Sequence, residues 1–477
     1  MARYFKFHRL PDIEAEVARL GLTLRFDEDL RPLFEPTSFG SLRVGNRFCV
    51  QPMEGCDGTA DGAPDELVFR RYERFGGGGA KLIWGEAAAV TPEGRATPRQ
   101  LLVAEHTLPG LARMLEGCRA AHRRECGSDD DLVVGLQLTH SGRYSHPRPL
   151  IAVHDPILDP RTFVERRTDR VVDASYPPVD DDYLKGLVDR YVEAARRAYA
   201  IGFQFVDVKQ CHRYLLSELL AAKERPGPYG GSFENRTRLA RDIIQAIRAE
   251  VPGLTIATRI NVYDCIPYRK RAEDAEGEPC PWQTPLRCAW GTSEADPLTP
   301  DLTEPLRWIG EMRRLGVACV NVSMGSPYAT PHVIRPFEYP PPDGYETPEH
   351  PLIGVDRHFR LTATIQEAVP DLPIVGSGYS YLQEFLPQAA AANVRDRRVT
   401  FPGLGRGTLA QPDFVRQLAA HGKLERKRIC RTFSYCTALM RSKHNELGQF
   451  ATGCPPFDKE VYGPIWREAK GENGQTT

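Results

Sequence analysis

Short apolar runs recur along the 477-residue chain, and each is followed by a segment long enough to hold a helix. Apolar runs without alternation are typical of strands buried on both faces, as in a parallel sheet. The last run is weaker than the others because Pro402 interrupts it. The eight runs predicted to be strands are residues 48–53, 80–88, 132–138, 203–209, 255–262, 319–323, 372–378 and 398–406.

The segments between the runs have the apolar spacing of amphipathic helices, clearest over residues 187–203, 234–251 and 305–317. One stripe of the first helix is formed by Leu187, Tyr191, Ala194, Ala195 and Ala198. Eight helix–strand alternations indicate repeated βα units. Because no G-x-G-x-x-G follows the first strand, the pattern favours an α/β fold of the closed (β/α)8 TIM barrel type over an open doubly wound sheet.

The barrel is predicted to occupy residues 33–425, with an N-terminal extension at 1–32 and a C-terminal extension at 426–477. Long stretches rich in Pro, Gly and charge follow three of the strands. In (β/α)8 barrels the loops after the strands carry the chemistry. We therefore expect three long βα loops at the catalytic mouth, at residues 143–180, 264–300 and 326–350.

The charge composition indicates which kinds of molecule the protein binds. Lys plus Arg number 62 against 63 Asp plus Glu, so no basic face indicates nucleic acid, and small-molecule partners are expected. No 18-residue apolar run and no signal-peptide pattern occurs, which predicts a cytoplasmic protein without a membrane segment. The sequence leaves the oligomeric state open, a homo-oligomer included.

Twelve cysteines in so long a chain are too sparse for a disulfide scaffold, and reduced thiols are expected. Cys430, Cys436 and Cys454 form a regional group, separated by five and seventeen residues. That spacing matches no compact metal signature, so no metal site is predicted.

Glycine-rich turns end the last two predicted strands, at Gly376-Ser377-Gly378 and at Gly405-Arg406. Glycines there let backbone N–H groups face a ligand, and the loops after strands 7 and 8 are the recurrent phosphate site of such barrels. Arg406 adds a cation suited to bidentate contact. The sequence thus predicts a phosphate site at these two turns.

Five ordered motifs between about Leu33 and about Leu418 resemble the old yellow enzyme family of flavin-dependent oxidoreductases. The motifs are Asn46-Arg47 with Gln51-Pro52-Met53, Gly85-Glu86-Ala87 with Glu93-Gly94-Arg95, QLTHSGR at 137–143, YGGSFENR at 229–236, and Gly405-Arg406 with Gln411-Pro412-Asp413.

The resemblance implies FMN bound without a covalent link at the barrel mouth and reduced by NADH or NADPH. It implies that Pro52, Met53 and Ala87 line the isoalloxazine, that Gln137 bonds its pyrimidine edge, and that Arg259 lies near N1. It also implies that the phosphate is bound by Gly376, Ser377, Gly378, Gly405 and Arg406. A cation near N1 suits a flavin that becomes negative on accepting a hydride.

The resemblance also implies hydride transfer to the β-carbon of an activated alkene. Such a step needs a donor or cation on the substrate oxygen and an acid for the α-carbon. His212 is the predicted donor and Tyr214 the predicted acid. The family has a histidine where this chain has Lys209, which favours a polar or carboxylated substrate. Glu54 adds a carboxylate to the pocket, and Lys209 either contacts substrate or pairs with Glu54.

His140 and Arg143, at the end of the third predicted strand, are further candidates for the substrate pocket. Some relatives carry an iron–sulfur cluster next to this barrel. Phe433 stands where the second cysteine ligand of that motif falls. We therefore expect no cluster.

Other functions remain open at this stage. The same flavin site run in reverse gives a desaturase, an aromatising dehydrogenase or an amine dehydrogenase. A lysine at a barrel strand end also suits a Schiff-base lyase acting through Lys209. A flavin-binding protein without catalysis is the last alternative. The choice between NADH and NADPH is not readable from the sequence.

Overall fold

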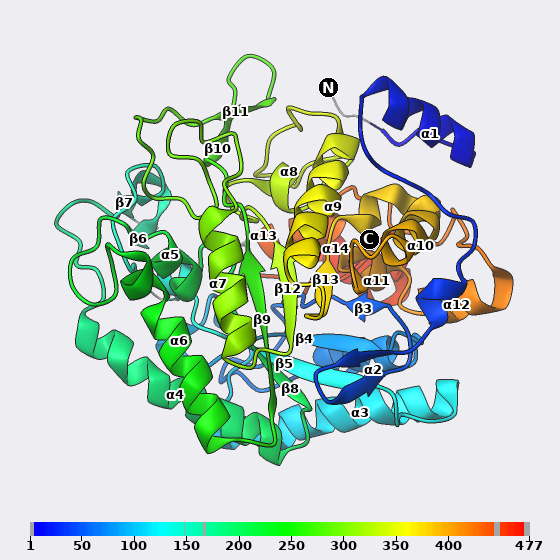
Figure 1. The fold of residues 1–477 in the computed structure, drawn as a ribbon, viewed down its shortest axis with the longest axis horizontal. Coiled ribbons are helices and arrows are strands. Elements are labelled where there is room, and N and C mark those ends of the chain that lie inside the picture. The colour runs from blue at the N-terminus through cyan, green and yellow to red at the C-terminus, as the bar shows by residue number, and fades with distance from the viewer. Residues whose placement is uncertain (1–3, 147, 166–167, 443–448, 472–477) are drawn as a thin grey trace.

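The computed structural model describes residues 4–146, 148–165, 168–442 and 449–471. Its centre is a closed barrel of eight parallel strands, in which each strand pairs with the next along the chain and the last pairs with the first (Figure 1). The predicted fold is confirmed, and Pro402 lies within the last strand. The barrel strands are β3 (Cys49–Val50), β4 (Leu82–Ala89), β5 (Val133–Thr139), β8 (Phe205–Val208), β9 (Thr255–Asn261), β12 (Cys319–Ser323), β13 (Ile374–Gly376) and β14 (Phe401–Leu404).

Amphipathic helices surround the barrel (Figure 1). The first long predicted helix begins earlier than the spacing indicated, at Asp181, because the Asp180 side chain accepts a hydrogen bond from the Tyr183 backbone and caps it. The stripe predicted for this helix is buried. The outer helices are α2 (Glu66–Gly76), α3 (Leu108–Cys126), α4 (Asp181–Ala200), α6 (Phe233–Glu250), α7 (Thr303–Arg314), α9 (Pro351–Ala368), α10 (Leu386–Arg395) and α12 (Phe414–His421).

A hairpin of β1 (Thr37–Phe39) and β2 (Leu42–Val44) closes the amino-terminal end of the barrel. Phe39 is fully buried among inward-facing strand residues, with its ring centroid 4.8 Å from that of Phe205 and 6.2 Å from that of Trp84. The interior is therefore a packed core at this end, which leaves the opposite end for a ligand.

The segments after the strands carry short elements of their own. The predicted long loops at 143–180 and 264–300 contain two-stranded hairpins, and the loop at 326–350 contains a short helix. The strands and helices of the mouth are β6 (Phe163–Glu165), β7 (Arg170–Val171), β10 (Tyr268–Lys270), β11 (Gly277–Pro279), α5 (Leu215–Leu220), α8 (Pro331–Ile334) and α11 (Arg406–Ala410). Short 3-10 helices are η1 (Arg31–Phe34), η2 (Pro92–Gly94), η3 (Glu105–Thr107), η4 (Gly142–Tyr144), η5 (Asp159–Arg161) and η6 (Tyr379–Phe385).

Both predicted extensions pack against the barrel, as far as they lie within the described residues. The N-terminal segment carries α1 (Leu10–Arg19), and the C-terminal segment carries α13 (Tyr435–Arg441) and α14 (Lys459–Ala469). The Thr452 backbone donates to the Gly55 carbonyl at 2.7 Å, and Asp458 binds Arg70 of α2 at 2.7 Å. The C-terminal segment thus lies against the segment that follows β3.

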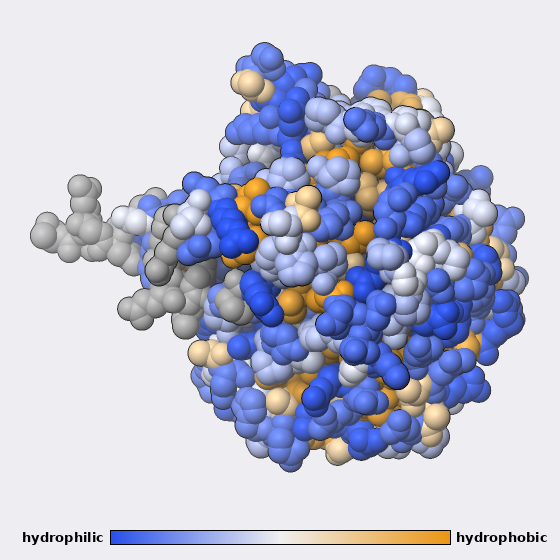
Figure 2. Space-filling view, turned by 90° about the vertical axis from the view of Figure 1, so that its left-hand side faces the viewer, coloured by the Kyte–Doolittle hydropathy of each residue, from blue (hydrophilic) through white to orange (hydrophobic). Residues whose placement is uncertain are grey.

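Hydrophilic residues cover most of the face shown in Figure 2, and hydrophobic residues show in recesses between them. Across the part of the chain that the structure describes, no helix combines the length and the hydropathy needed to cross a membrane.

Candidate functional site

A cavity opens at the carboxyl ends of the barrel strands. Most of the predicted site residues line it. They are Pro52, Met53, Glu54, Ala87, Gln137, Lys209, His212, Tyr214, Arg259, Ser377, Gly378, Gly405 and Arg406.

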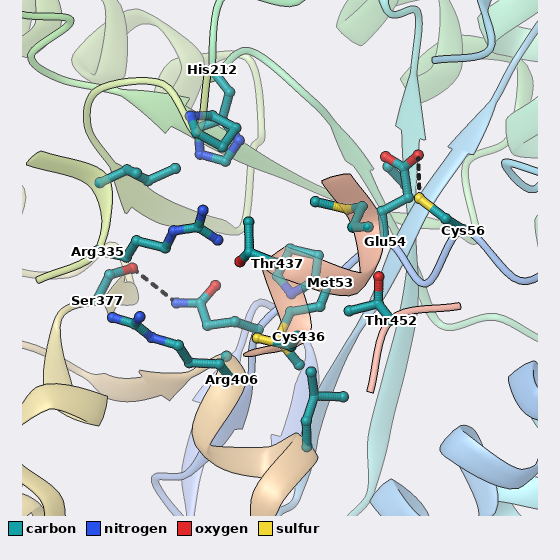
Figure 3. A pocket seen from close by; sticks show the side chains of 18 of the residues that line it. Met53, Glu54, Cys56, His212, Arg335, Ser377, Arg406, Cys436, Thr437 and Thr452 are labelled. Atoms are coloured by element: carbon teal, nitrogen blue, oxygen red, sulfur yellow. Dashed lines mark hydrogen bonds between the residues drawn. The ribbon is translucent and has the colours of Figure 1, made fainter. Parts of the chain in front are cut away.

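Two arginines lie beside Ser377 at one end of the cavity (Figure 3). Arg406 follows β14, and Arg335 comes from the loop after β12. The Arg406 side chain donates to the Pro336 carbonyl. Arg335 Nε and Nη2 and Arg406 Nη1 are buried and have no hydrogen-bond partner among the described residues. Donors left without partners in a buried site indicate that a ligand completes it.

The charges of these arginines are not neutralised by a nearby ion pair among the described residues. Burial and the proximity of Arg406 lower the pKa of Arg335 to about 10, and burial lowers the pKa of Arg406. Two adjacent buried guanidinium groups repel each other, and an anion between them would remove that repulsion. Gly378, with φ +98, turns the backbone beside them.

The floor of the cavity is fixed by amide and carboxylate side chains at the strand ends. Gln51 Nε2 donates to the Gly376 carbonyl at 3.2 Å and to Ser377 Oγ at 3.1 Å. Gly376 therefore lies behind the cavity wall, where its carbonyl binds Gln51, and it does not line the cavity itself. Gln137 Nε2 donates to the fully buried Asp207 at 2.5 Å, which fixes the amide at the cavity edge.

Arg259 reaches the same floor from β9. Its backbone N–H donates to Asp207 Oδ1 at 2.7 Å, and its Nη1 donates weakly to the Pro52 carbonyl at 3.5 Å. Its Nε is buried without a partner among the described residues, and burial lowers the pKa of Arg259. A second cationic donor is therefore available to a ligand, separate from the arginine pair.

The Gly85-Glu86-Ala87 motif positions the loop that follows β3. The β4–β5 register shifts between Trp84 and Ala87, which turns Glu86 toward that loop. Glu86 accepts a hydrogen bond from the Gly55 backbone at 2.9 Å and pairs with Arg71 at 2.6 Å. This buried pair holds Pro52, Met53 and Glu54 at the cavity.

In the stretch from Lys209 to Tyr214, some side chains face the cavity and others face the core. Lys209, His212 and Tyr214 line the cavity, whereas Cys211 is fully buried. Arg213 points away to Asp264, with Nε 3.2 Å from Oδ2. His212 and Arg213 have φ +67 and +63, and this left-handed backbone turns consecutive side chains in opposite directions.

Lys209 lies over the ring of Tyr214, with Nζ 3.6 Å from the ring centroid. Burial lowers the pKa of Lys209, and burial raises that of Glu54 to about 7. The two residues act on each other electrostatically, but within the described chain Lys209 makes no ion pair. The predicted alternative of a direct Lys209–Glu54 pair is not formed in this structure.

His212 and Tyr214 are both uncharged in this setting. His212 Nε2 lies 2.8 Å from Ser323 Oγ, and burial holds its pKa well below the usual range. The Tyr214 hydroxyl lies 3.3 Å from the hydroxyl of Tyr328, and burial raises the pKa of Tyr214 well above 10. A neutral donor and a protonated phenol therefore face the same cavity as a lysine.

His140 and Arg143 do not line the cavity, contrary to the sequence prediction. His140 Nε2 lies 2.7 Å from the Tyr183 hydroxyl, and burial lowers its pKa to about 4. Arg143 is held by Glu218 at 2.9 Å and by Asp159 at 2.5 Å. The chain enters η4 directly after β5, which directs both side chains away from the cavity. There His140 binds Tyr183, and Arg143 binds the two carboxylates.

Several lining residues carried no signal in the sequence. Arg335, Tyr328 and Thr97 lie in loops without a recognised motif, although the first two belong to the predicted mouth loop at 326–350. The C-terminal segment supplies another wall of the cavity through Cys436, Thr437, Met440, Arg441, Gln449 and Thr452.

Of the three regional cysteines, Cys436 lies in that wall, whereas Cys430 and Cys454 do not line the cavity. Cys430, Cys436 and Cys454 are free and half-buried. Where the structure describes the chain, no group of three or more His, Cys, Asp or Glu side chains is arranged to hold a metal ion.

Known proteins share this architecture. The structure of a 2-naphthoyl-CoA reductase in complex with 2-naphthoyl-CoA superposes with a TM-score of 0.67 at 17% identity, covering 92% of this chain and 58% of that one. Morphinone reductase in complex with tetrahydroNAD superposes with a TM-score of 0.57 at 21% identity, covering 83% of this chain and 92% of that one. At these identities the likeness concerns the fold.

Comparison of the sequence with known proteins gives information beyond the fold. An NADPH dehydrogenase of Bacillus pumilus (strain SAFR-032) is 29% identical over 239 residues, which is 49% of this chain and 64% of that protein. The chain thus spans less than two thirds of this relative's length. A family model described as the NADH:flavin oxidoreductase / NADH oxidase family matches residues 32–279, more than half of the 477 residues. The chain therefore belongs to the NADH:flavin oxidoreductase / NADH oxidase family, in agreement with its resemblance to old yellow enzymes.

Proposed function

We propose that the chain is an FMN-dependent oxidoreductase that passes a hydride from NADH or NADPH to an activated carbon–carbon double bond of a polar or carboxylated substrate. One observation carries the proposal. A single cavity has an arginine pair with unpartnered donors at one end, and Lys209, His212 and Tyr214 also line it. When bound, FMN supplies the hydride-transfer chemistry that no side chain provides.

The buried donors of the cavity fit FMN. Arg335 and Arg406, with the turns at Ser377-Gly378 and Gly405, would hold the phosphate, because guanidinium groups match its planar pairs of oxygens. Arg259 is the further cation, suited to the flavin N1 region. Pro52, Met53 and Ala87 would lie against the rings, and Gln137 against the pyrimidine edge.

The residues at 209–214 would handle the substrate. Lys209 and His212 would bind the substrate oxygen on which charge develops, and the Tyr214 hydroxyl would give a proton to the α-carbon. A buried lysine with a lowered pKa regains favourable interactions when an anion binds beside it. This favours a substrate with a carboxylate or a strongly polarised carbonyl. An NADPH dehydrogenase of similar sequence and a 2-naphthoyl-CoA reductase of similar fold are consistent with this class of reaction.

The proposal includes a cytoplasmic location and small-molecule partners. All twelve cysteines are free, and most of them are buried, as in proteins of reducing compartments.

Anaerobic half-reactions test the proposal. Purified protein should bind FMN, be reduced by at least one nicotinamide, and be reoxidised by unsaturated acids faster than by neutral enones. Tyr214→Phe should slow reoxidation by about 100-fold or more while leaving reduction by the nicotinamide unchanged. Tyr144→Phe, which keeps the neighbouring ring, serves as the control.

Other outcomes identify the other functions. Reduction of the flavin by a saturated acid or an amine, without reduction by either nicotinamide, would identify a dehydrogenase working in the opposite direction. Borohydride trapping of a carbonyl substrate at Lys209 in flavin-free protein would identify a Schiff-base lyase. A yellow protein that accepts electrons from no donor would be a binding protein.

A further inference from the structure

A second tyrosine connects Tyr214 with the outside of the cavity. Tyr214 is 4% exposed, whereas Tyr328, in the loop after β12, is 39% exposed. Their hydroxyl oxygens are 3.3 Å apart, and either group can donate to the other. The phenol of Tyr214 is thus hydrogen-bonded to that of a partly exposed residue that lines the same cavity.

Tyr328 is held in this position from two sides. The ring of Tyr144, which belongs to η4 after β5, stacks on it with centroids 4.3 Å apart and an interplanar angle of 30°. The Arg441 guanidinium of α13 lies 4.9 Å from its centroid, and Arg441 Nη2 donates to the Pro327 carbonyl at 2.8 Å. Two loops and the C-terminal segment therefore fix one orientation of the Tyr328 ring.

We propose that Tyr328 relays protons between solvent and Tyr214, which makes it a positioning and proton-transfer residue of the reaction proposed above, on which the inference rests. In each turnover the substrate β-carbon receives a hydride, and the α-carbon receives the Tyr214 proton. The Tyr214 phenolate then takes the proton of Tyr328, and Tyr328 takes one from water. The sum is one hydride from the nicotinamide and one proton from solvent added across the double bond.

The charges around the pair suit this role. Lys209 Nζ, 3.6 Å from the Tyr214 ring, stabilises a phenolate there, and Arg441 stabilises one on Tyr328. Burial above all, with Glu54 as a smaller cause, raises the pKa of both tyrosines and keeps them protonated between turnovers. Either phenolate can therefore form transiently without becoming the resting state.

A comparison of single turnover with steady state tests the relay. Tyr328→Phe should leave the single turnover of pre-reduced enzyme with an alkene within about twofold of wild type, because Tyr214 begins with its proton. Its kcat should fall by at least about tenfold, with a larger solvent deuterium isotope effect on kcat, because reprotonation becomes limiting. Tyr328→His, which keeps a proton-transferring group, should restore part of kcat. Tyr199→Phe, at an exposed tyrosine of the outer helix α4, should change neither rate.

Wild-type kcat and isotope effect in Tyr328→Phe would overturn the relay, as would an equal loss of the single-turnover and steady-state rates. If wild-type enzyme reacts with no alkene, the proposed function fails, and a ground-state measurement decides on the tyrosine contact. With carbon-13 in the tyrosine rings, the Tyr214 phenolic-carbon resonance should shift in Tyr328→Phe but not in Tyr199→Phe. An unshifted resonance would overturn the inference.

Discussion

Arg335 offers a direct way to test how the cavity recognises its cofactor. Replacement by glutamine removes a cation whose Nε and Nη2 are buried without partners among the described residues. Net hydrogen bonds to charged groups are each worth about 1.5 to 3 kcal/mol, so two of them amount to about 3 to 6 kcal/mol. Relief of the repulsion with Arg406 in the free protein offsets part of this, which leaves about 3 kcal/mol.

About 3 kcal/mol corresponds to a weakening of FMN binding by about 100-fold, since each 1.4 kcal/mol is a factor of ten. Riboflavin lacks the phosphate, so its affinity should stay within about threefold of the wild-type value. Arg335→Lys, which keeps a charge without the planar fork, should fall between wild type and glutamine.

Titration of the flavin-free protein with each flavin, followed by fluorescence, measures both dissociation constants. Arg269→Gln, an exposed arginine of β10 paired with Glu278, is the control for a change of surface charge. Equal weakening for FMN and riboflavin would refute the reasoning, because it would mean that Arg335 supports the fold of the pocket and not the phosphate. Unchanged FMN binding would refute it as well.

Three further changes have defined outcomes. The folded pKa of Glu54, about 7, exceeds its ordinary 4.5, so its protonation stabilises the flavin-free fold below pH 4.5, and this contribution is lost as the pH rises through 7. Glu54→Gln should abolish about 3 kcal/mol of that pH dependence in urea unfolding. A wild-type slope in the variant would show that Glu54 is ionised at neutral pH. Lys209→Met should raise KM at least about tenfold for an unsaturated acid but not for a neutral enone, and parallel changes for both would exclude carboxylate binding by Lys209. Phe39→Ala should cost about 3 to 5 kcal/mol of unfolding free energy, against less than about 0.5 for the exposed neighbour Ser38→Ala, and a small loss would mean that the hairpin does not contribute to the barrel core.

The barrel could be predicted from the sequence because its strands are buried on both faces and therefore form continuous apolar runs. An apolar run such as the one at β5, followed by a helix with one apolar stripe, leaves little alternative to a βα unit. The start of α4 was missed because capping depends on one side chain, Asp180, and not on periodicity. The hairpin of β1 and β2 was missed for a similar reason, since each strand has only three residues.

Some residues of the candidate site could likewise be predicted from the sequence, and others could not. Residues at strand ends, such as Gln137 and Arg259, follow from the strands that carry them. Arg335 and Tyr328 enter the cavity through the path of a long loop, which local spacing does not determine. Arg143 was misplaced because Glu218, far along the chain, binds its guanidinium in a buried pair. A charged side chain at a strand end can face the mouth or a partner behind it, and only the tertiary structure decides between them.

The C-terminal wall of the cavity has a consequence for biosynthesis. Every barrel strand precedes residue 405, so all eight emerge from the ribosome before α13 and Thr452 do. Chains fold as they emerge, and the barrel can close around an open pocket whose last side is still in the exit tunnel. Flavin capture would then be completed only after synthesis of the segment that lines this side, which separates folding of the scaffold from loading of the cofactor.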